Sequence, residues 1–211
     1  MIAVLSYMLG VFTTAVIVWE LGPFRSMQRP GQAVGVQRIA RPADAPPTPA
    51  VAEGTSGHTE DVPSELADRD LAVPVEGVQR SALIDTFADA RDGDRKHEAI
   101  DILAPRDTPV LAVEDGVIAR LFTSKAGGLT IYQFDPTEQF VYYYAHLDSY
   151  AGNLNQGDRV RKGQVIGYVG TTGNAPKDTP HLHFAIFRMT DEKKWWQGTP
   201  VDPFNILRKT R

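Results

Sequence analysis

The chain of 211 residues contains no cysteine, only five histidines and an almost balanced set of charges. The absence of cysteine excludes a disulfide scaffold, a thiolate zinc site and a cysteine nucleophile. The 22 basic and 26 acidic residues leave a net charge of -4, so we expect no nucleic-acid partner. Hydrophobic residues make up 42% and charged residues 23%, as in a folded soluble domain. The length fits one domain of moderate size with accessory segments.

The N-terminal segment carries no charged side chain from Met1 to Trp19. At about 1.5 Å per residue it is long enough to cross a hydrocarbon core of about 30 Å. A signal peptide has a basic start and a small-residue cleavage site, and neither is evident. We therefore expect residues 1–24 to be a membrane anchor or signal-like helix, with membrane contact through residues 1–19. Arg25 and Arg29 follow it and favour a cytoplasmic location for the next segment, by the positive-inside rule.

A Pro-rich segment follows, and we predict a flexible, disordered linker over residues 25–70. Six of the 15 prolines fall between positions 30 and 63, and no aromatic residue occurs between Phe24 and Phe87. A stretch with so few large apolar side chains cannot offset the entropy of ordering it. The folded domain is predicted over residues 71–211.

Short apolar runs bounded by glycine and proline recur through that domain, without a long amphipathic helical pattern. The pattern predicts a mostly β fold, an antiparallel β-sandwich or a barrel-like sheet. Residues 109–113 and 116–122 read as two strands joined by a hairpin turn at Glu114-Asp115-Gly116. Four further strands are expected at residues 129–134, 140–146, 164–170 and 181–187.

Histidines in this domain stand in positions that could bind a metal. On a strand, His181 and His183 point to one face and Leu182 to the core. One imidazole can then bind a metal while the other works beside it, although a pair of surface histidines on an edge strand is the simpler alternative. His97 and Asp101 lie in a loop that runs into a short extended piece. With a later histidine they supply two nitrogen ligands and one oxygen ligand, a set suited to tetrahedral zinc with one open position.

His97 alone would read as a solvated loop residue, and His146 alone as a histidine hydrogen-bonded in the sheet. Together the residues offer a three-ligand set and two spare histidines. Spare histidines are what a hydrolase needs when it lacks a glutamate base, and no His-Glu-x-x-His motif is present.

Several ordered motifs resemble the lysostaphin-type (LytM-type) zinc metalloendopeptidases. The resemblance covers about residues 73–207 and rests on these motifs: His97-x-x-x-Asp101, Tyr144-Ala-His146-Leu, Gly157-Asp-x-Val160-x-x-Gly163-Gln-x-Ile-Gly167 and Pro180-His181-Leu-His183-Phe184. The family usually has glycine two residues after the first histidine, where this chain has Ala99.

The resemblance implies an antiparallel β fold with a groove, one Zn²⁺ per domain, and hydrolysis of peptide cross-bridges in bacterial peptidoglycan during cell-wall remodelling. It implies that His97, Asp101 and His183 bind zinc and that His146 and His181 are catalytic. Tyr144, Asn174 and Trp195 are weaker candidates for lining the substrate groove. The domain would then lie on the periplasmic or extracellular side of a single-pass inner-membrane or plasma-membrane protein.

Two other functions are compatible with the sequence. The first is a catalytically silent envelope module that binds peptidoglycan or activates another wall hydrolase, which would make an envelope protein a possible partner. The second is a biotinyl or lipoyl carrier, because residues 157–167 resemble the hairpins of such domains. A carrier needs an exposed lysine in a tight turn, which is not evident, and has no use for four histidines.

Overall fold

The computed structural model describes residues 62–90 and 96–209. The expected membrane anchor, residues 1–24, and most of the expected linker lie outside these ranges. No helix within the described ranges has the length and apolar character needed to cross a bilayer.

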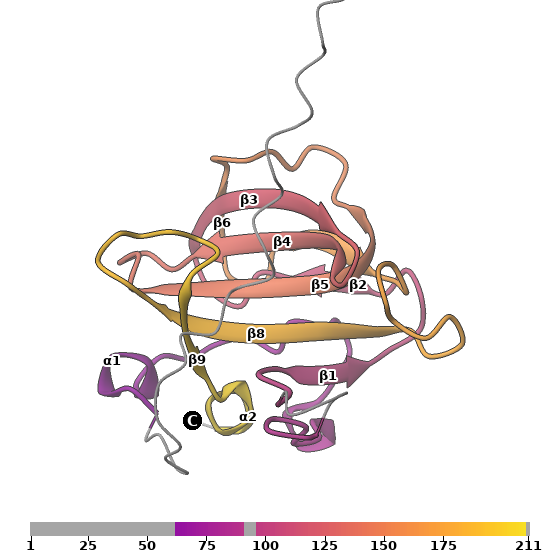
Figure 1. Ribbon diagram of the computed structural model, residues 1–211, viewed down its shortest axis with the longest axis horizontal. Coiled ribbons are helices and arrows are strands. Elements are labelled where there is room, and N and C mark those ends of the chain that lie inside the picture. Colours follow the sequence, from indigo (N-terminus) through magenta and orange to yellow (C-terminus); the bar gives the residue numbers. More distant parts are fainter. Residues whose placement is uncertain (1–61, 91–95, 210–211) are drawn as a thin grey trace, which may run out of the picture. The chain divides into compact units, whose positions relative to one another are not determined.

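Short strands dominate the described residues, and the helices are brief (Figure 1). The elements in chain order are α1 (Ser64–Ala67), the 3-10 turn η1 (Arg80–Ala82), β1 (Ile100–Leu103), β2 (Pro109–Leu111), β3 (Gly116–Ser124), β4 (Gly128–Phe134), β5 (Phe140–Tyr150), β6 (Arg159–Val160), β7 (Val165–Val169), β8 (His181–Met189), β9 (Gly198–Val201) and α2 (Pro203–Arg208). The mostly β fold predicted from the sequence is confirmed.

The strands form one antiparallel sheet with the order β1-β8-β5-β4-β3-β6. Strand β9 pairs with the C-terminal part of β8, and the β2–β7 pair joins the sheet through β5. A sandwich of two separate sheets was one expectation, and the described strands instead share a single network. The reason is the length of β5, which spans 11 residues. Its first part pairs with β4 and β8, and its last part, from Leu147 to Tyr150, pairs with β7.

The predicted hairpin between residues 109–113 and 116–122 is wrong. Strand β2 pairs with β7, whereas β3 pairs with β4 and β6. The connecting residues Ala112 and Val113 are fully buried, and the Val113 N–H donates to the Tyr144 hydroxyl at 3.1 Å. The Val113 carbonyl accepts from the Ala72 N–H at 2.7 Å. These bonds draw the connection into the core, so the chain passes on to another strand instead of turning back.

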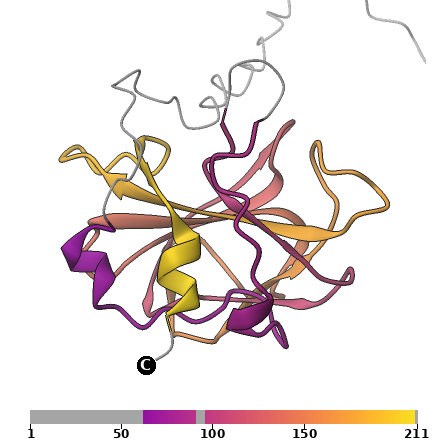
Figure 2. The same ribbon diagram turned by 90° about the horizontal axis from the view of Figure 1, so that it is seen from below.

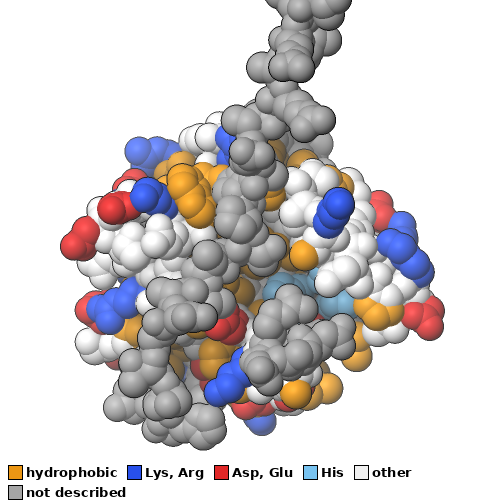
Figure 3. Space-filling model, viewed as in Figure 1, with side chains coloured by type: hydrophobic (Ala, Val, Ile, Leu, Met, Phe, Trp, Pro, Cys, Tyr) orange, Lys and Arg blue, Asp and Glu red, His pale blue; other side chains and the backbone are white. Residues whose placement is uncertain are grey.

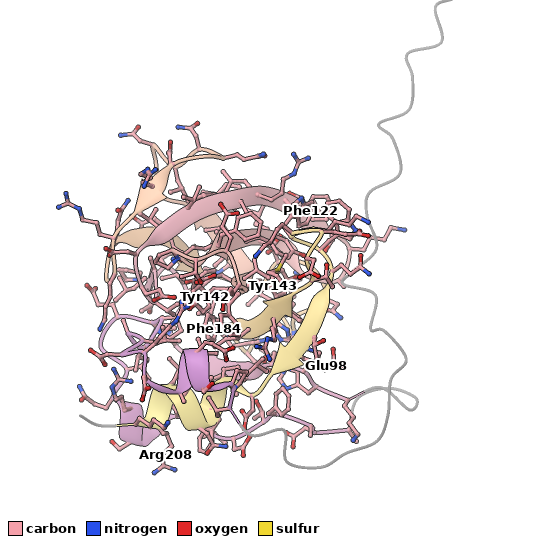
Figure 4. The ribbon with its side chains drawn as sticks, turned by 90° about the vertical axis from the view of Figure 1, so that its left-hand side faces the viewer. Glu98, Phe122, Tyr142, Tyr143, Phe184 and Arg208 are labelled. Carbon is pink, nitrogen blue, oxygen red and sulfur yellow. The ribbon has the colours of Figure 1, made fainter. Side chains whose placement is uncertain are left out.

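The sheet carries a different set of side chains on each face. Tyr142, Tyr144 and Phe184 pack into the main core, as the two-residue period of strands requires. Tyr143 and its neighbours pack on the opposite face in a second, smaller cluster. In Figure 4, Phe122 and Tyr143 lie toward one side, and Tyr142 and Phe184 toward the other. We call the side that carries Phe122, Tyr132, Tyr143, Ala145 and His183 the metal face.

The folded domain begins before residue 71, the start expected from the sequence. Leu66 in α1 is fully buried in the core. Arg69 donates to Glu114 at 2.7 Å and to the buried Asp135 at 2.8 Å. Figure 1 and Figure 2 show α1 (indigo) and α2 (yellow) near each other, and in Figure 1 they lie on the same side of β8 as β1. A single buried leucine and one arginine in a Pro-rich, aromatic-free stretch give no periodic signal, which is why residues 62–70 resemble a linker in sequence.

Candidate metal centre

Strands β1 and β8 bring Asp101 and His183 together, because the two residues are direct partners in the register of the sheet. Side chains of partner residues stand on the same face about 5 Å apart at their Cβ atoms. The Asp101 N–H points away from β8 and donates to the Thr86 hydroxyl at 3.0 Å. As predicted, Leu182 turns into the core while His181 and His183 share the other face.

His97 reaches the same place from the loop before β1. The loop is held by two backbone hydrogen bonds, from Ala88 N–H to the His97 carbonyl and from His97 N–H to the Asp89 carbonyl. The His97 Nδ1–H donates to the Thr86 carbonyl at 2.7 Å. A carbonyl only accepts, so the neutral ring keeps its lone pair on Nε2. The ring is buried, and Nε2 faces His183 and Asp101.

Three ligand atoms therefore converge from His97, Asp101 and His183. His97 Nε2 lies 3.1 Å from His183 Nδ1 and 3.2 Å from Asp101 Oδ1, and His183 Nδ1 lies 2.9 Å from Asp101 Oδ1. Zinc–nitrogen bonds of about 2.0–2.1 Å at tetrahedral angles separate neighbouring ligands by about 3.3–3.4 Å. The observed triangle is slightly tighter, with His97 buried and the side chains of Asp101 and His183 partly exposed. Two nitrogens and one oxygen at this spacing fit zinc, so these residues form a candidate zinc site.

The charge of the site is set by Asp101. Burial on its own raises the pKa of this carboxyl, but hydrogen bonding and attraction to the His183 and His97 imidazoles outweigh it and hold the pKa well below its usual range. The carboxylate is therefore ionised at neutral pH and supplies the negative charge that a divalent cation requires.

His146 reaches the metal face through a β-bulge. Between the pairs Ile131–Tyr144 and Leu129–Leu147, β4 advances by two residues and β5 by three. The extra residue lets His146 leave the core side while Leu147 returns to it. His146 has a φ of 61°, which is uncommon for a residue other than glycine. Its N–H donates to the Gly127 carbonyl at 2.8 Å, which holds this conformation.

His146 and His181 stand side by side next to the ligand triangle. Their ring centroids are 5.0 Å apart, and the His146 centroid is 5.5 Å from that of His183. The His146 Nδ1–H donates to the Thr172 carbonyl at 2.9 Å, and the His181 Nδ1–H donates to the Thr179 carbonyl at 2.8 Å. In their neutral forms both rings keep the Nε2 lone pair free. His181 Nε2 lies 3.9 Å from Asp101 Oδ1.

The pKa of His146 is lowered to about 4, first by burial and then by the nearby His183 imidazole. His146 is therefore neutral at pH 7 and able to accept a proton. Figure 3 shows histidine side chains at the surface of the molecule, with hydrophobic side chains beside them.

The structure separates the three weaker candidates for the substrate groove. The prediction that Tyr144 lines the groove is wrong, because its side chain is fully buried in the core and its hydroxyl donates to Gln133 at 2.8 Å. Trp195 is half-buried on the metal face, with its ring centroid 4.6 Å from that of Tyr132. Asn174 is exposed in the turn before β8. A role for Trp195 and Asn174 in substrate binding stays a prediction.

Three residues that position the site carry no signal in the sequence. Thr86 contacts His97 and Asp101, and the carbonyls of Thr172 and Thr179 orient the two spare histidines. Backbone carbonyls are present at every residue, so only the fold shows which ones face an imidazole.

The model of Peptidase family M23 matches residues 95–203, a segment that contains all five histidine and aspartate residues of the site. The chain belongs to Peptidase family M23. It is 35% identical over 130 residues to the L-Ala–D-Glu endopeptidase of Bacillus subtilis, covering 58% of this chain and 38% of that protein. It is 35% identical over 113 residues to the glycyl-glycine endopeptidase ALE-1 of Staphylococcus capitis, covering 53% of this chain and 29% of that protein.

Structural comparison agrees with the family assignment. The catalytic domain of lysostaphin from Staphylococcus simulans matches with a TM-score of 0.52 and 27% identity, over 62% of this chain and 96% of that domain. The resemblance to the lysostaphin type is thereby confirmed. The chain spans well under half the length of the curated relatives above, at 38% and 29%. The similarity therefore covers only part of each relative.

Proposed function

We propose that this M23 domain is a zinc-dependent endopeptidase that hydrolyses peptide bonds in the cross-bridges of bacterial peptidoglycan. The main support for this function is that the histidines of the site fall into two groups with different positions. His97 and His183 converge with Asp101 on a common point, whereas His146 and His181 stand beside that point with free Nε2 lone pairs. A structural zinc site has no use for two such neighbours, but a hydrolytic site needs them.

Each group in the site then has a chemical task. Zinc, when bound, supplies Lewis-acid activation of a water molecule and of the scissile carbonyl. One of His146 and His181 accepts the proton of the attacking water, and the other, once protonated, donates a hydrogen bond to the oxygen that gains negative charge. The carbonyls of Thr172 and Thr179 hold both rings so that Nε2 faces the reaction.

The peptidoglycan substrate is supported by the relatives. Both named relatives are endopeptidases, one named for the L-Ala–D-Glu bond and the other for the glycyl-glycine bond. The present site does not require a charged side chain of the substrate for its chemistry. We therefore propose a wall peptide as the substrate class, and mass spectrometry of the released peptides identifies the bond that is cleaved.

The test is hydrolysis of purified peptidoglycan by the zinc-loaded protein, followed by mass spectrometry of the released peptides. We expect new amino termini, loss of activity with a chelator, and recovery when zinc is added back. His183→Ala is the control that removes a ligand. A protein that binds zinc and peptidoglycan but releases no peptide would instead be the silent envelope module described above.

We also propose that the domain acts outside the cytoplasmic membrane while tethered to it. The support is the uncharged run from Met1 to Trp19 and the location of peptidoglycan. Against it stand Arg25 and Arg29, which favour the cytoplasmic side for the residues that follow the run. A topology reporter fused after Arg211 decides between the two locations. Activity of a reporter that works only when exported supports the tethered enzyme, and activity of a reporter that works only in the cytoplasm contradicts it.

A further inference from the structure

Two large hydrophobic side chains in the described part of the chain are strongly exposed, Ile84 at 62% and Leu103 at 60%. Leu103 is the last residue of β1 and lies two positions after the ligand Asp101, so both side chains stand on the metal face. Its register partner on β8 is His181, one of the two spare histidines. An apolar side chain thus lies open to solvent directly beside the reactive site, where its exposure brings no folding energy.

The backbone of β1 is open at the same residue. Strand β1 is the end of the main strand order, with β8 as its partner. The Asp101 N–H points outward to Thr86, and the Ala104 N–H points inward to the Pro180 carbonyl. In an antiparallel pair this direction alternates along the strand, so the N–H and C=O of Leu103 point outward like those of Asp101. Within the described ranges no backbone strand pairs with that outer side of β1 at Leu103.

Thr86 limits the open edge on one side. It occupies the outward position at Asp101, and no described residue occupies the next outward position at Leu103. An edge that exposes a donor, an acceptor and an apolar side chain is the pattern by which proteins bind an extended peptide through strand addition. Leu103 and Asp101 are about 6–7 Å apart at their Cα atoms, the rise of two strand residues. A peptide bound there reaches the ligand triangle within one or two residues.

We propose that Leu103 and the outer edge of β1 form a subsite for the substrate peptide, which selects an apolar side chain next to the scissile bond. The inference rests on the proposed endopeptidase function. The peptide main chain pairs with the N–H and C=O of Leu103, and a small apolar side chain packs on the Leu103 side chain beside His181. The favoured substrate class is an extended peptide with alanine or a larger aliphatic residue at this position, in preference to glycine.

The experiment crosses a change in the enzyme with a change in the peptide. The probes are fluorogenic peptides containing an L-Ala–D-Glu or a glycyl-glycine bond, each made with alanine and with glycine at the residues on either side of the cleaved bond. The variants are Leu103→Gln, the conservative Leu103→Met, and Ile84→Gln as a matched control of nearly equal exposure. Zinc content and thermal stability are measured for all, because neither should change when an exposed side chain is replaced.

We expect the wild type to prefer alanine over glycine on one side of the bond by about fourfold in kcat/KM, the factor for burying one methylene group. The preference should appear in KM, persist in Leu103→Met and Ile84→Gln, and disappear in Leu103→Gln. N-methylation of the peptide amide that pairs with the Leu103 carbonyl should raise KM by about three- to tenfold, the range for one hydrogen bond.

Failure of this inference is distinguishable from failure of the proposed function. If the wild type cleaves a probe and Leu103→Gln keeps the same preference for alanine, the subsite is wrong and the endopeptidase stands. If the wild type cleaves none of the probes, binding of the same peptides to the zinc-loaded protein is measured by calorimetry. Binding that Leu103→Gln weakens about fourfold supports the subsite on a non-catalytic module, and equal or undetectable binding overturns it.

Discussion

Replacing Thr86 by valine tests how the metal site is held. The Thr86 hydroxyl accepts the Asp101 N–H at 3.0 Å, and the Thr86 carbonyl accepts the His97 Nδ1–H at 2.7 Å. Valine keeps the shape and the carbonyl but removes the hydroxyl. The Asp101 N–H then loses its partner, at a cost of about 1–3 kcal/mol. If β1 shifts to recover a hydrogen bond, the Asp101 carboxylate leaves its place in the triangle.

We expect zinc to bind about 10- to 100-fold more weakly to Thr86→Val, the usual scale for losing a partner behind a metal ligand. That range corresponds to about 1.4–2.7 kcal/mol, in agreement with the cost of the lost hydrogen bond. The assay is zinc competition against a chromophoric chelator, with unfolding of the metal-free protein measured in parallel. Thr86→Ser keeps the hydroxyl and should restore most of the affinity.

If Thr86→Val binds zinc as tightly as the wild type does, the Thr86 hydroxyl does not support the metal ligands. If both variants lose the same stability and bind zinc equally tightly, Thr86 supports only the loop. Thr86 lies outside the segment that matches the family model, residues 95–203, so this chain would support its metal from a flanking segment.

Three further predictions concern stability. Arg69→Met should lower the free energy of unfolding by about 3 kcal/mol, because it leaves the buried Asp135 carboxylate without its cation. Arg188→Met breaks an exposed pair with Glu65 and should have little effect on stability. Equal losses of stability in urea titrations would contradict this. Burial raises the pKa of Asp135, but hydrogen bonds from Thr137, Phe140 and Arg69 outweigh it and lower the pKa below its usual value of about 3.9. The Asp135 carboxylate therefore stabilises the fold above that pH, and this stabilisation is lost as the pH falls. The difference in free energy of unfolding between the wild type and Asp135→Asn should be larger at pH 6 than at pH 3. A difference that does not change with pH would exclude the charge of Asp135 as its cause. Gly127→Ala should lower the free energy of unfolding by about 1–3 kcal/mol, because the new Cβ would lie 2.2 Å from the Tyr143 hydroxyl. Gly152→Ala should leave the melting temperature nearly unchanged, because no atom lies within 4 Å of its new Cβ. A larger effect at Gly152 than at Gly127 in thermal melts would contradict the packing described above.

Local patterns sufficed for part of the fold and for the shared face of His181 and His183. The two-residue spacing of His181 and His183, with Leu182 between them, already determines that both imidazoles share a face and that leucine is buried. The composition of the short apolar runs predicts a mostly β domain. The convergence of His97, Asp101 and His183 came from the family resemblance, because no local rule brings residues about eighty positions apart together.

The failures concern long-range pairing. The sequence from Pro109 to Phe122 has the pattern of a hairpin, but the burial of Ala112 and Val113 sends the two strands to different partners. Tyr144 was expected to line the groove as an aromatic residue close to His146. The β-bulge at His146 breaks the alternation, so Tyr144 faces the core and His146 lies beside His183. A bulge is set by the neighbouring strands, and nothing in the local sequence around His146 announces it.

The division of labour among the histidines is the central claim, and the most direct test compares His181→Ala with His183→Ala. The measurement is zinc content by atomic absorption, made on the same samples as the rate of peptide release from purified peptidoglycan. We predict that His183→Ala loses both zinc and activity, because it removes one atom of the ligand triangle. His181→Ala should keep near-stoichiometric zinc while its rate falls by about 100-fold or more. If His181→Ala loses zinc as fully as His183→Ala does, or keeps the wild-type rate, the assignment of ligand and catalyst is contradicted.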